Sequence, residues 1–220
     1  MNFDIAQAVL WIFPLLLAVV LHEVAHGWVA YRLGDDTAER MGRLTLNPLA
    51  HVDPIGTVLM PALLMMSGAP MFGYAKPVPI GWHNLRNPAR DMIYVAAAGP
   101  AMNLLLAALC ALALTAVNPR GPYPTGFGSG HLQVAMPLAL MAFHGVQLNV
   151  LLAVFNLLPI PPLDGGRVAV GLLPPGPAEA LARLEPFGFM IIFMLLLSGL
   201  LGSVIGPPIN AIIHLLLGAL

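Results

Sequence analysis

Residues 5–31 read IAQAVLWIFPLLLAVVLHEVAHGWVAY, an apolar run that is long enough to cross a bilayer as a helix and that carries HEVAH near its end. His22 and His26 are four residues apart, so they share one helix face at a rise of about 6 Å, and both imidazoles can reach a single ion. Glu23 would lie beside that ion as a general base for an activated water. An uncompensated ionisable side chain in a membrane helix costs roughly 2.5 kcal/mol or more, which favours a functional site over a snorkelling polar cluster.

The composition describes an integral membrane protein. Of the 220 residues, 59% are hydrophobic and only 9% are charged, against roughly 25% charged in soluble domains. Lipid admits only helices or closed barrels, and apolar runs without two-residue alternation indicate helices. Further apolar segments fall at about 55–71, 92–117, 134–158, 187–201 and 204–220.

The sequence therefore predicts an all-α polytopic membrane protein with five or six hydrophobic segments. We expect a single membrane-embedded domain over residues 1–220, with no appended soluble domain. The net charge of −1 offers no basic face for nucleic acid. The one cysteine, Cys110, excludes both a disulfide framework and a thiolate zinc site.

Asp164 is the strongest candidate for a third metal ligand. It lies just beyond segment 134–158, where prolines break the helix and Gly165 and Gly166 permit close backbone approach. His51, Asp53 and His144 compete with it. Turn-forming or solvated roles are the ordinary expectation for the first two, and His144 could instead line a polar cleft or bond a neighbouring helix. Two imidazoles and one carboxylate favour one Zn²⁺ ion per chain with a position left for water.

A common depth for these ligands constrains the topology. The ends of the first segment and of segment 134–158 must lie on the same side, which requires segment 55–71, short and interrupted by Pro61, to enter and leave from one face. This re-entrant arrangement places eight of the nine Lys and Arg residues on the side of the site and leaves Arg120 opposite. Positive charge concentrates in cytoplasmic loops, so we expect the site to lie toward the cytoplasmic face.

Smaller features are also predicted from local patterns. Alternation over Gly42–Leu46 predicts a short strand, and the prolines of 73–79 predict an extended strand or loop. A break between the last two segments is predicted at four helix-breaking residues: Gly202, Gly206, Pro207 and Pro208.

Three separated motifs give the chain a family resemblance. With HEVAH, Gly99–Asn103 and Asn156–Gly165 in this order, residues 15–170 resemble the site-2 protease family of intramembrane zinc metalloproteases. The resemblance implies that His22, His26 and Asp164 hold zinc and that Glu23 is the catalytic carboxylate. It also implies a three-helix catalytic core made of the first, third and fourth apolar segments.

The resemblance extends to substrates. It implies hydrolysis of peptide bonds within or beside transmembrane segments of single-span or signal-peptide-like membrane proteins. We expect the plasma membrane of a prokaryote as the location. Asn103 and Asn156 would orient the substrate or stabilise an oxyanion, or else join two helices. No recognition domain is evident, so a separate adaptor could select substrates.

The main alternative is a membrane metal-ion transporter or metal sensor that uses the same histidines. A transport path needs ligands spread across several depths of the bilayer, whereas the strong candidates here gather near one face. A catalytically dead scaffold is also an alternative, but it gains no evident advantage from keeping both His and Glu. The pattern thus favours the enzyme.

Overall fold

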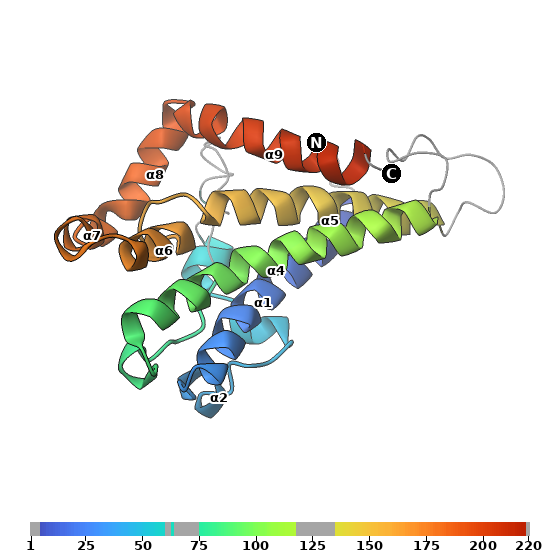
Figure 1. The fold of residues 1–220 in the computed structure, drawn as a ribbon. Helices are drawn as coiled ribbons and strands as arrows, with labels where there is room; N and C mark the ends of the chain where they lie inside the picture. The colour runs from blue at the N-terminus through green and yellow to red at the C-terminus, as the bar shows by residue number, and fades with distance from the viewer. Residues whose placement is uncertain (1–4, 60–62, 64–74, 118–134, 219–220) are drawn as a thin grey trace.

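The computed structural model describes residues 5–59, 63, 75–117 and 135–218, which form helices joined by irregular loops (Figure 1). The long elements are α1 (Ile5–Arg32), α4 (Pro88–Val117), α5 (Ala135–Asn156) and α9 (Leu200–Gly218). The shorter helices are α2 (Thr37–Arg40), α6 (Asp164–Leu172), α7 (Pro175–Ala182) and α8 (Gly188–Leu197). Short helical turns are formed by η1 (Pro48–His51), η2 (Pro54–Leu59), η3 (Trp82–Asn84) and η4 (Glu185–Phe187). The parts of the chain described here contain no strand.

Helices α1, α4 and α5 pack against one another, α6 packs on α4, and α9 lies along α5 (Figure 1). Several of the contacts between α4 and α5 are made by small side chains, which let helix backbones approach closely in a membrane, whereas α9 packs on them through leucine and isoleucine. The buried cluster consists of Ala107, Ala111, Leu114, Ala139, Val146, Val150 and Leu217.

Five helical stretches are long and apolar enough to cross a membrane, among the residues that the structure describes. They are Val9–Arg32, Pro88–Val117, Met136–Asn156, Pro175–Leu197 and Leu200–Gly218. The prediction of an all-α polytopic membrane protein is therefore confirmed.

The ends of the connection between α1 and α4 lie together. The Arg86 N–H donates to the Leu33 carbonyl at 3.2 Å, and the Gly81 N–H donates to the Asp35 carboxylate at 2.6 Å. The chain thus leaves α1 and enters α4 at one end of the bundle, as the re-entrant hypothesis requires. The hypothesis itself stays a prediction, because most of segment 55–71 after η2 lies outside the described residues.

The predicted strand at Gly42–Leu46 is wrong. A strand needs a backbone ladder, but the Arg43 guanidinium instead donates to the Lys76 carbonyl at 2.9 Å and to the Pro77 carbonyl at 3.3 Å. Because Pro77 and Pro79 carry no N–H, the extended residues 75–80 cannot offer a regular row of donors. The alternating residues Gly42–Leu46 therefore belong to an irregular loop that the Arg43 side chain holds against residues 76–77.

The predicted helix break at Gly202, Gly206, Pro207 and Pro208 is also wrong, since α9 runs through all four. The break lies at Gly199, whose φ of 75° ends α8 in the left-handed conformation that glycine adopts easily. Glycine and proline inside membrane helices are tolerated when local adjustments satisfy the freed carbonyl groups. Their presence in an apolar segment therefore did not mark a helix end.

Candidate metal centre

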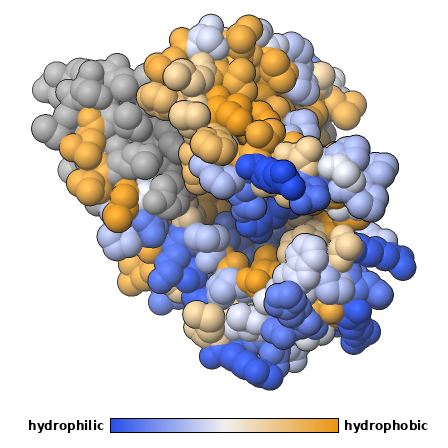
Figure 2. All heavy atoms as spheres, turned by 90° about the vertical axis from the view of Figure 1, so that its left-hand side faces the viewer, coloured by the Kyte–Doolittle hydropathy of each residue, from blue (hydrophilic) through white to orange (hydrophobic). Residues whose placement is uncertain are grey.

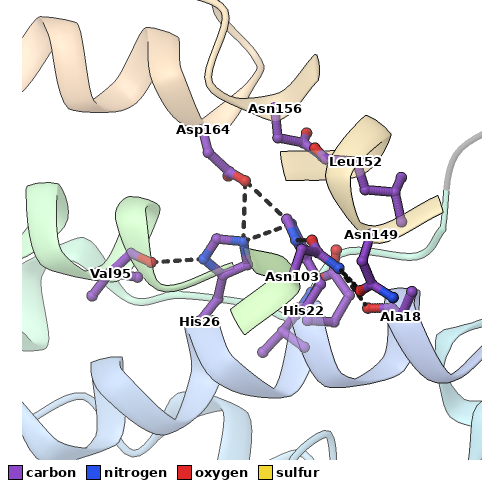
Figure 3. Close-up of polar contacts among 11 residues, drawn as sticks. Ala18, His22, His26, Val95, Asn103, Asn149, Leu152, Asn156 and Asp164 are labelled. Atoms are coloured by element: carbon purple, nitrogen blue, oxygen red, sulfur yellow. Dashed lines mark hydrogen bonds and ion pairs between the residues drawn. The ribbon is translucent and has the colours of Figure 1, made fainter. Parts of the chain in front are cut away.

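Three side chains from α1 and α6 converge on one point (Figure 3). The Nε2 atoms of His22 and His26 are 3.1 Å apart, and they lie 3.2 and 3.3 Å from Asp164 Oδ2. Ligands bound tetrahedrally at 2.0–2.1 Å lie about 3.3–3.4 Å from one another. This triangle therefore has the dimensions of three protein ligands around one zinc ion.

The electrostatics of Asp164 suit a cation. Oδ2 is buried and has no hydrogen-bond partner, a costly state for a carboxylate oxygen unless an ion is bound. Burial raises the pKa of the Asp164 carboxyl, but the close approach of the His22 and His26 imidazoles outweighs it and holds the pKa well below its usual range. The carboxylate is thus ionised, as a metal ligand must be.

Helix α4 leaves space beside the two imidazoles at Gly99. A Cβ on this residue would lie 2.6 Å from His22 Nε2 and would overlap His26 Nε2. The absence of a side chain at Gly99 therefore leaves open space next to both Nε2 atoms. This gives a physical reason for glycine in the Gly99–Asn103 motif.

Asp164 reaches the histidines because α6 folds back tightly on the end of α5. A Cβ at Gly165 would overlap the Leu157 carbonyl oxygen, and one at Gly166 would overlap the Pro161 backbone nitrogen. Both glycines therefore permit the backbone contact that the sequence predicted. Asp164 is the first residue of α6.

Each imidazole is oriented through its second nitrogen. His22 Nδ1 donates to Asn103 Oδ1 at 2.5 Å, and His26 Nδ1 donates to the Val95 carbonyl at 2.7 Å. Both Nε2 atoms are thereby left for an ion, because a donor at Nδ1 fixes the neutral tautomer.

Asn103 is itself held by further polar contacts (Figure 3). Its amide donates to Asn149 Oδ1 at 2.8 Å and to the Ala18 carbonyl at 3.3 Å, and Asn149 donates to the Gly145 carbonyl at 2.8 Å. Asn103 has no exposed surface and lies behind His22. The structure thus shows Asn103 as a link between α1, α4 and α5, and its predicted role toward a substrate stays a prediction.

Sequence reasoning did not connect Asn149 or the Val95 carbonyl to the site. Asn149 was noticeable only as a polar residue in an apolar segment. Its contact with Asn103 depends on how α4 and α5 are rotated against each other, which local spacing does not reveal.

The competing ligands lie elsewhere. His51 donates from Nε2 to the Thr45 carbonyl at 2.9 Å, and Asp53 accepts from the N–H groups of two η2 residues. His144 stacks on Trp11 with ring centroids 3.8 Å apart. Among the candidates, the structure therefore brings Asp164 to the histidine pair.

A cleft of about 480 Å³ opens beside the three side chains. Glu23 and Asn156 line it together with Ala75, Pro77, Val78 and Ile80 and with apolar side chains from α5 and α8. Glu23 Oε2 accepts the Val78 N–H at 2.8 Å, and the Asn156 amide donates to the Leu152 carbonyl at 3.0 Å. Figure 2 shows hydrophilic residues gathered across the middle of the face where α2, α6 and α7 lie, and the surface is hollowed there.

Comparisons with known proteins agree with this site. The family model "Peptidase family M50" matches residues 10–135 and 127–197. "Putative zinc metalloprotease YwhC" of Bacillus subtilis is 37% identical over 202 residues, which is 91% of this chain and 85% of that protein. "Putative zinc metalloprotease Rip2" is 37% identical in Mycolicibacterium smegmatis and 33% identical in Mycobacterium tuberculosis, with 83% of this chain matched in each case.

The chain spans 64% of the length of these two Rip2 proteins. No solved structure matches it significantly.

The apolar helices, the His-His-Asp cluster and these relatives define a zinc metalloprotease embedded in a membrane. More particularly, the chain belongs to peptidase family M50, the site-2 protease family.

Proposed function

We propose that this chain is an intramembrane protease that hydrolyses peptide bonds within or beside transmembrane segments of membrane-protein substrates. One observation carries the proposal. The His22–His26–Asp164 triangle, with its orphaned carboxylate oxygen, lies at a cleft inside a bundle of membrane-spanning helices. His22, His26 and Asp164 would hold the zinc ion.

The zinc ion, when bound, acts as a Lewis acid and makes water nucleophilic near neutral pH. Glu23 follows His22 directly on α1 and lines the same cleft. Its carboxylate would take a proton from the attacking water and then give that proton to the departing amine nitrogen. No covalent acyl-enzyme is needed. Asn156, on the cleft wall, would orient the peptide or donate to the developing oxyanion.

The cleft wall supports an apolar peptide as substrate. Leu152, Phe155 and Phe189 line it, and they are suited to side chains of a transmembrane segment. A helix hides every backbone carbonyl in a hydrogen bond, so the substrate must unwind locally before cleavage. We infer single-span or signal-peptide-like proteins as substrates, with selection assisted by a separate adaptor.

The proposed location is the plasma membrane of a prokaryote, with the site toward the cytoplasm. The distribution of Lys and Arg supports this orientation. At the same end of α1, Arg32 lies over the exposed ring of Trp28 at 5.4 Å from its centroid, and such aromatic side chains are typical of a membrane–water interface. Reporter fusions after residue 80 should be cytoplasmic, and an external reporter would contradict the orientation.

The decisive experiment compares the wild type with Glu23→Gln on a panel of single-span proteins. We expect Glu23→Gln to abolish cleavage while zinc content and folding stay normal, and mass spectrometry should find bonds cut by the wild type alone. Glu179→Gln is the matched control, because Glu179 is exposed and pairs with Arg183 away from the cleft. Cleavage retained by Glu23→Gln would overturn the mechanism.

The transporter alternative gains no support from the structure. His22, His26 and Asp164 form the one potential metal-binding group in the portion of the chain that the structure describes, and it lies at a single depth. Transport of zinc into vesicles by Glu23→Gln, without proteolysis by the wild type, would favour that alternative.

A further inference from the structure

The extended residues 75–80 make a specific contact with Glu23. Within the Pro77–Val78–Pro79 triplet, only Val78 has a backbone N–H, because proline has none. That single donor goes to Glu23 Oε2 at 2.8 Å. The sequence therefore leaves one hydrogen-bond donor at this point of the loop, and its acceptor is the proposed catalytic carboxylate.

The residues preceding Val78 are fixed from the other side. The Lys76 N–H donates to the His51 carbonyl at 2.9 Å. Arg43, which is only 8% exposed, donates from Nη2 to the Lys76 and Pro77 carbonyls. The backbone groups of three consecutive residues are therefore bonded, and Arg43 braces the loop at the position of the Val78 amide.

Helix α1 holds Val78 at a second place through Gly27. This glycine lies four residues after Glu23, on the same face of α1. A Cβ on Gly27 would lie 2.6 Å from Leu44 Cδ2 and 2.9 Å from Val78 Cγ1. Gly27 therefore forms a notch for the Val78 side chain, which is 5% exposed.

We propose that the Val78 amide is a positioning group for the Glu23 carboxylate, and that Arg43 and Gly27 hold this amide in place. The inference rests on the proposed function, because it assumes proton transfer by Glu23. A glutamate has three rotatable bonds, and fixing one carboxylate oxygen restricts where the other can lie beside the cleft that Glu23 lines. Small misplacements of a reacting group can lower a rate by about 100-fold.

This role differs from that of a loop that only contacts substrate. Loss of a substrate contact raises KM, whereas loss of base orientation lowers kcat after the substrate is bound. Zinc content separates both outcomes from damage to the metal centre. Separate measurements of kcat, KM and zinc content therefore distinguish a positioning role from a substrate contact and from damage to the metal centre.

The test replaces the Val78 N–H by an ester oxygen, with the α-hydroxy analogue of valine introduced by nonsense suppression in the full chain. Suppression of the same codon with valine is the matched control. We expect kcat to fall about 10- to 100-fold, with KM and zinc content unchanged.

Gly27→Ala provides a second route if the ester protein does not fold, since the added methyl group displaces Val78. Gly202→Ala is its control, because nothing lies within 4 Å of a Cβ there. We expect Gly27→Ala to lower kcat and to leave zinc content unchanged. A native kcat in either variant would overturn the inference, as would a raised KM with native kcat. Retained activity in Glu23→Gln would instead overturn the proposed function.

Discussion

The helices around the metal centre and the last two helices are both apolar, yet they are packed differently. In the most apolar stretches of α1, α4 and α5, which could cross a membrane, 33% of the residues are buried. In the corresponding stretches that include α8 and α9, only 11% are buried. The first group is joined by polar contacts between helices, such as His22 with Asn103 and Asn103 with Asn149. In the second group, Ser198 and Ser203 donate to carbonyls three residues earlier in the chain.

Glycines show the same contrast. Gly99 on α4 is crowded by both imidazoles, whereas Gly202 and Gly206 on α9 have open space where a side chain would be. Apolar composition therefore identifies both groups as membrane helices, but only polar ties and close backbone contacts distinguish the part that performs chemistry. The same type of substitution should therefore have a larger effect in the helices around the metal centre than in α8 and α9.

The largest effect is expected at the third ligand. Asp164→Asn removes the charge that faces both imidazoles, so zinc affinity should fall on the order of a thousand-fold or more, and proteolysis should disappear. Metal content after dialysis against a zinc buffer measures this change. Asp36→Asn is the control, because Asp36 pairs with Arg40 at the surface. Normal zinc content in Asp164→Asn would exclude Asp164 as a ligand.

The next largest effect distinguishes crowded from open glycines. Gly99→Ala places a methyl group against the ligand nitrogens, so the variant should lose most of its zinc, or lose roughly 1–3 kcal/mol of stability from overpacking. Gly202→Ala should retain its zinc and remain within about 1 kcal/mol of the wild type. Zinc stoichiometry and thermal unfolding in detergent measure both. Equal behaviour of the two variants would contradict the need for space beside the imidazoles at Gly99.

A smaller effect is expected for the outer polar chain. Asn149→Leu removes the acceptor for Asn103 and loosens His22, so zinc affinity should fall about 10- to 100-fold. Asn156→Leu should leave zinc affinity unchanged while it lowers cleavage, because Asn156 lines the cleft and its amide donates to the Leu152 carbonyl. Competition with a zinc indicator gives both affinities. Equal zinc affinities in the two variants would argue against orientation of His22 by Asn149.

The smallest effect is expected at Asp35, which follows α1 and accepts hydrogen bonds from Gly81 and Asn84 in the loop before α4. Burial raises the pKa of Asp35, but hydrogen bonds from Thr37, Asn84 and Gly81 outweigh it and hold the pKa below the usual 3.8. A lowered pKa in the folded state means that the unfolded state binds protons first. The contribution of Asp35 is thus complete above about pH 4 and is lost as the pH falls through the folded pKa.

Asp35→Asn should therefore cost about 1–3 kcal/mol near neutral pH, and its unfolding should be less sensitive to acid than that of the wild type. Melting curves between pH 6 and pH 3 test this sign. An identical acid dependence in both proteins would contradict it.

The sequence predicted the parts of this molecule that depend on short-range periodicity. His22 and His26 lie together because a helix repeats every 3.6 residues. Asp164 could be predicted because the prolines and glycines around it permit a sharp return of the chain. The same reasoning failed at Gly42–Leu46, where alternation had no partner strand, and at Pro207 and Pro208, which stay inside α9.

Contacts that depend on the relative rotation of two segments could not be predicted. Asn149 meets Asn103 only because α4 and α5 pack at one register, and the Val78 amide meets Glu23 only because Arg43 and Gly27 set the position of a loop. Local sequence patterns do not predict these contacts, because they depend on how distant segments pack against one another.

The separation of His22, His26 and Asp164 along the chain has a consequence for the order in which the site can assemble. Two imidazoles are present as soon as α1 enters the bilayer, but the carboxylate that completes the triangle arrives only after α4 and α5 have been inserted. A nascent polypeptide that ends before residue 164 therefore has only an incomplete chelate. The full set of three side chains is consequently available to one ion only after residue 164 has been synthesised.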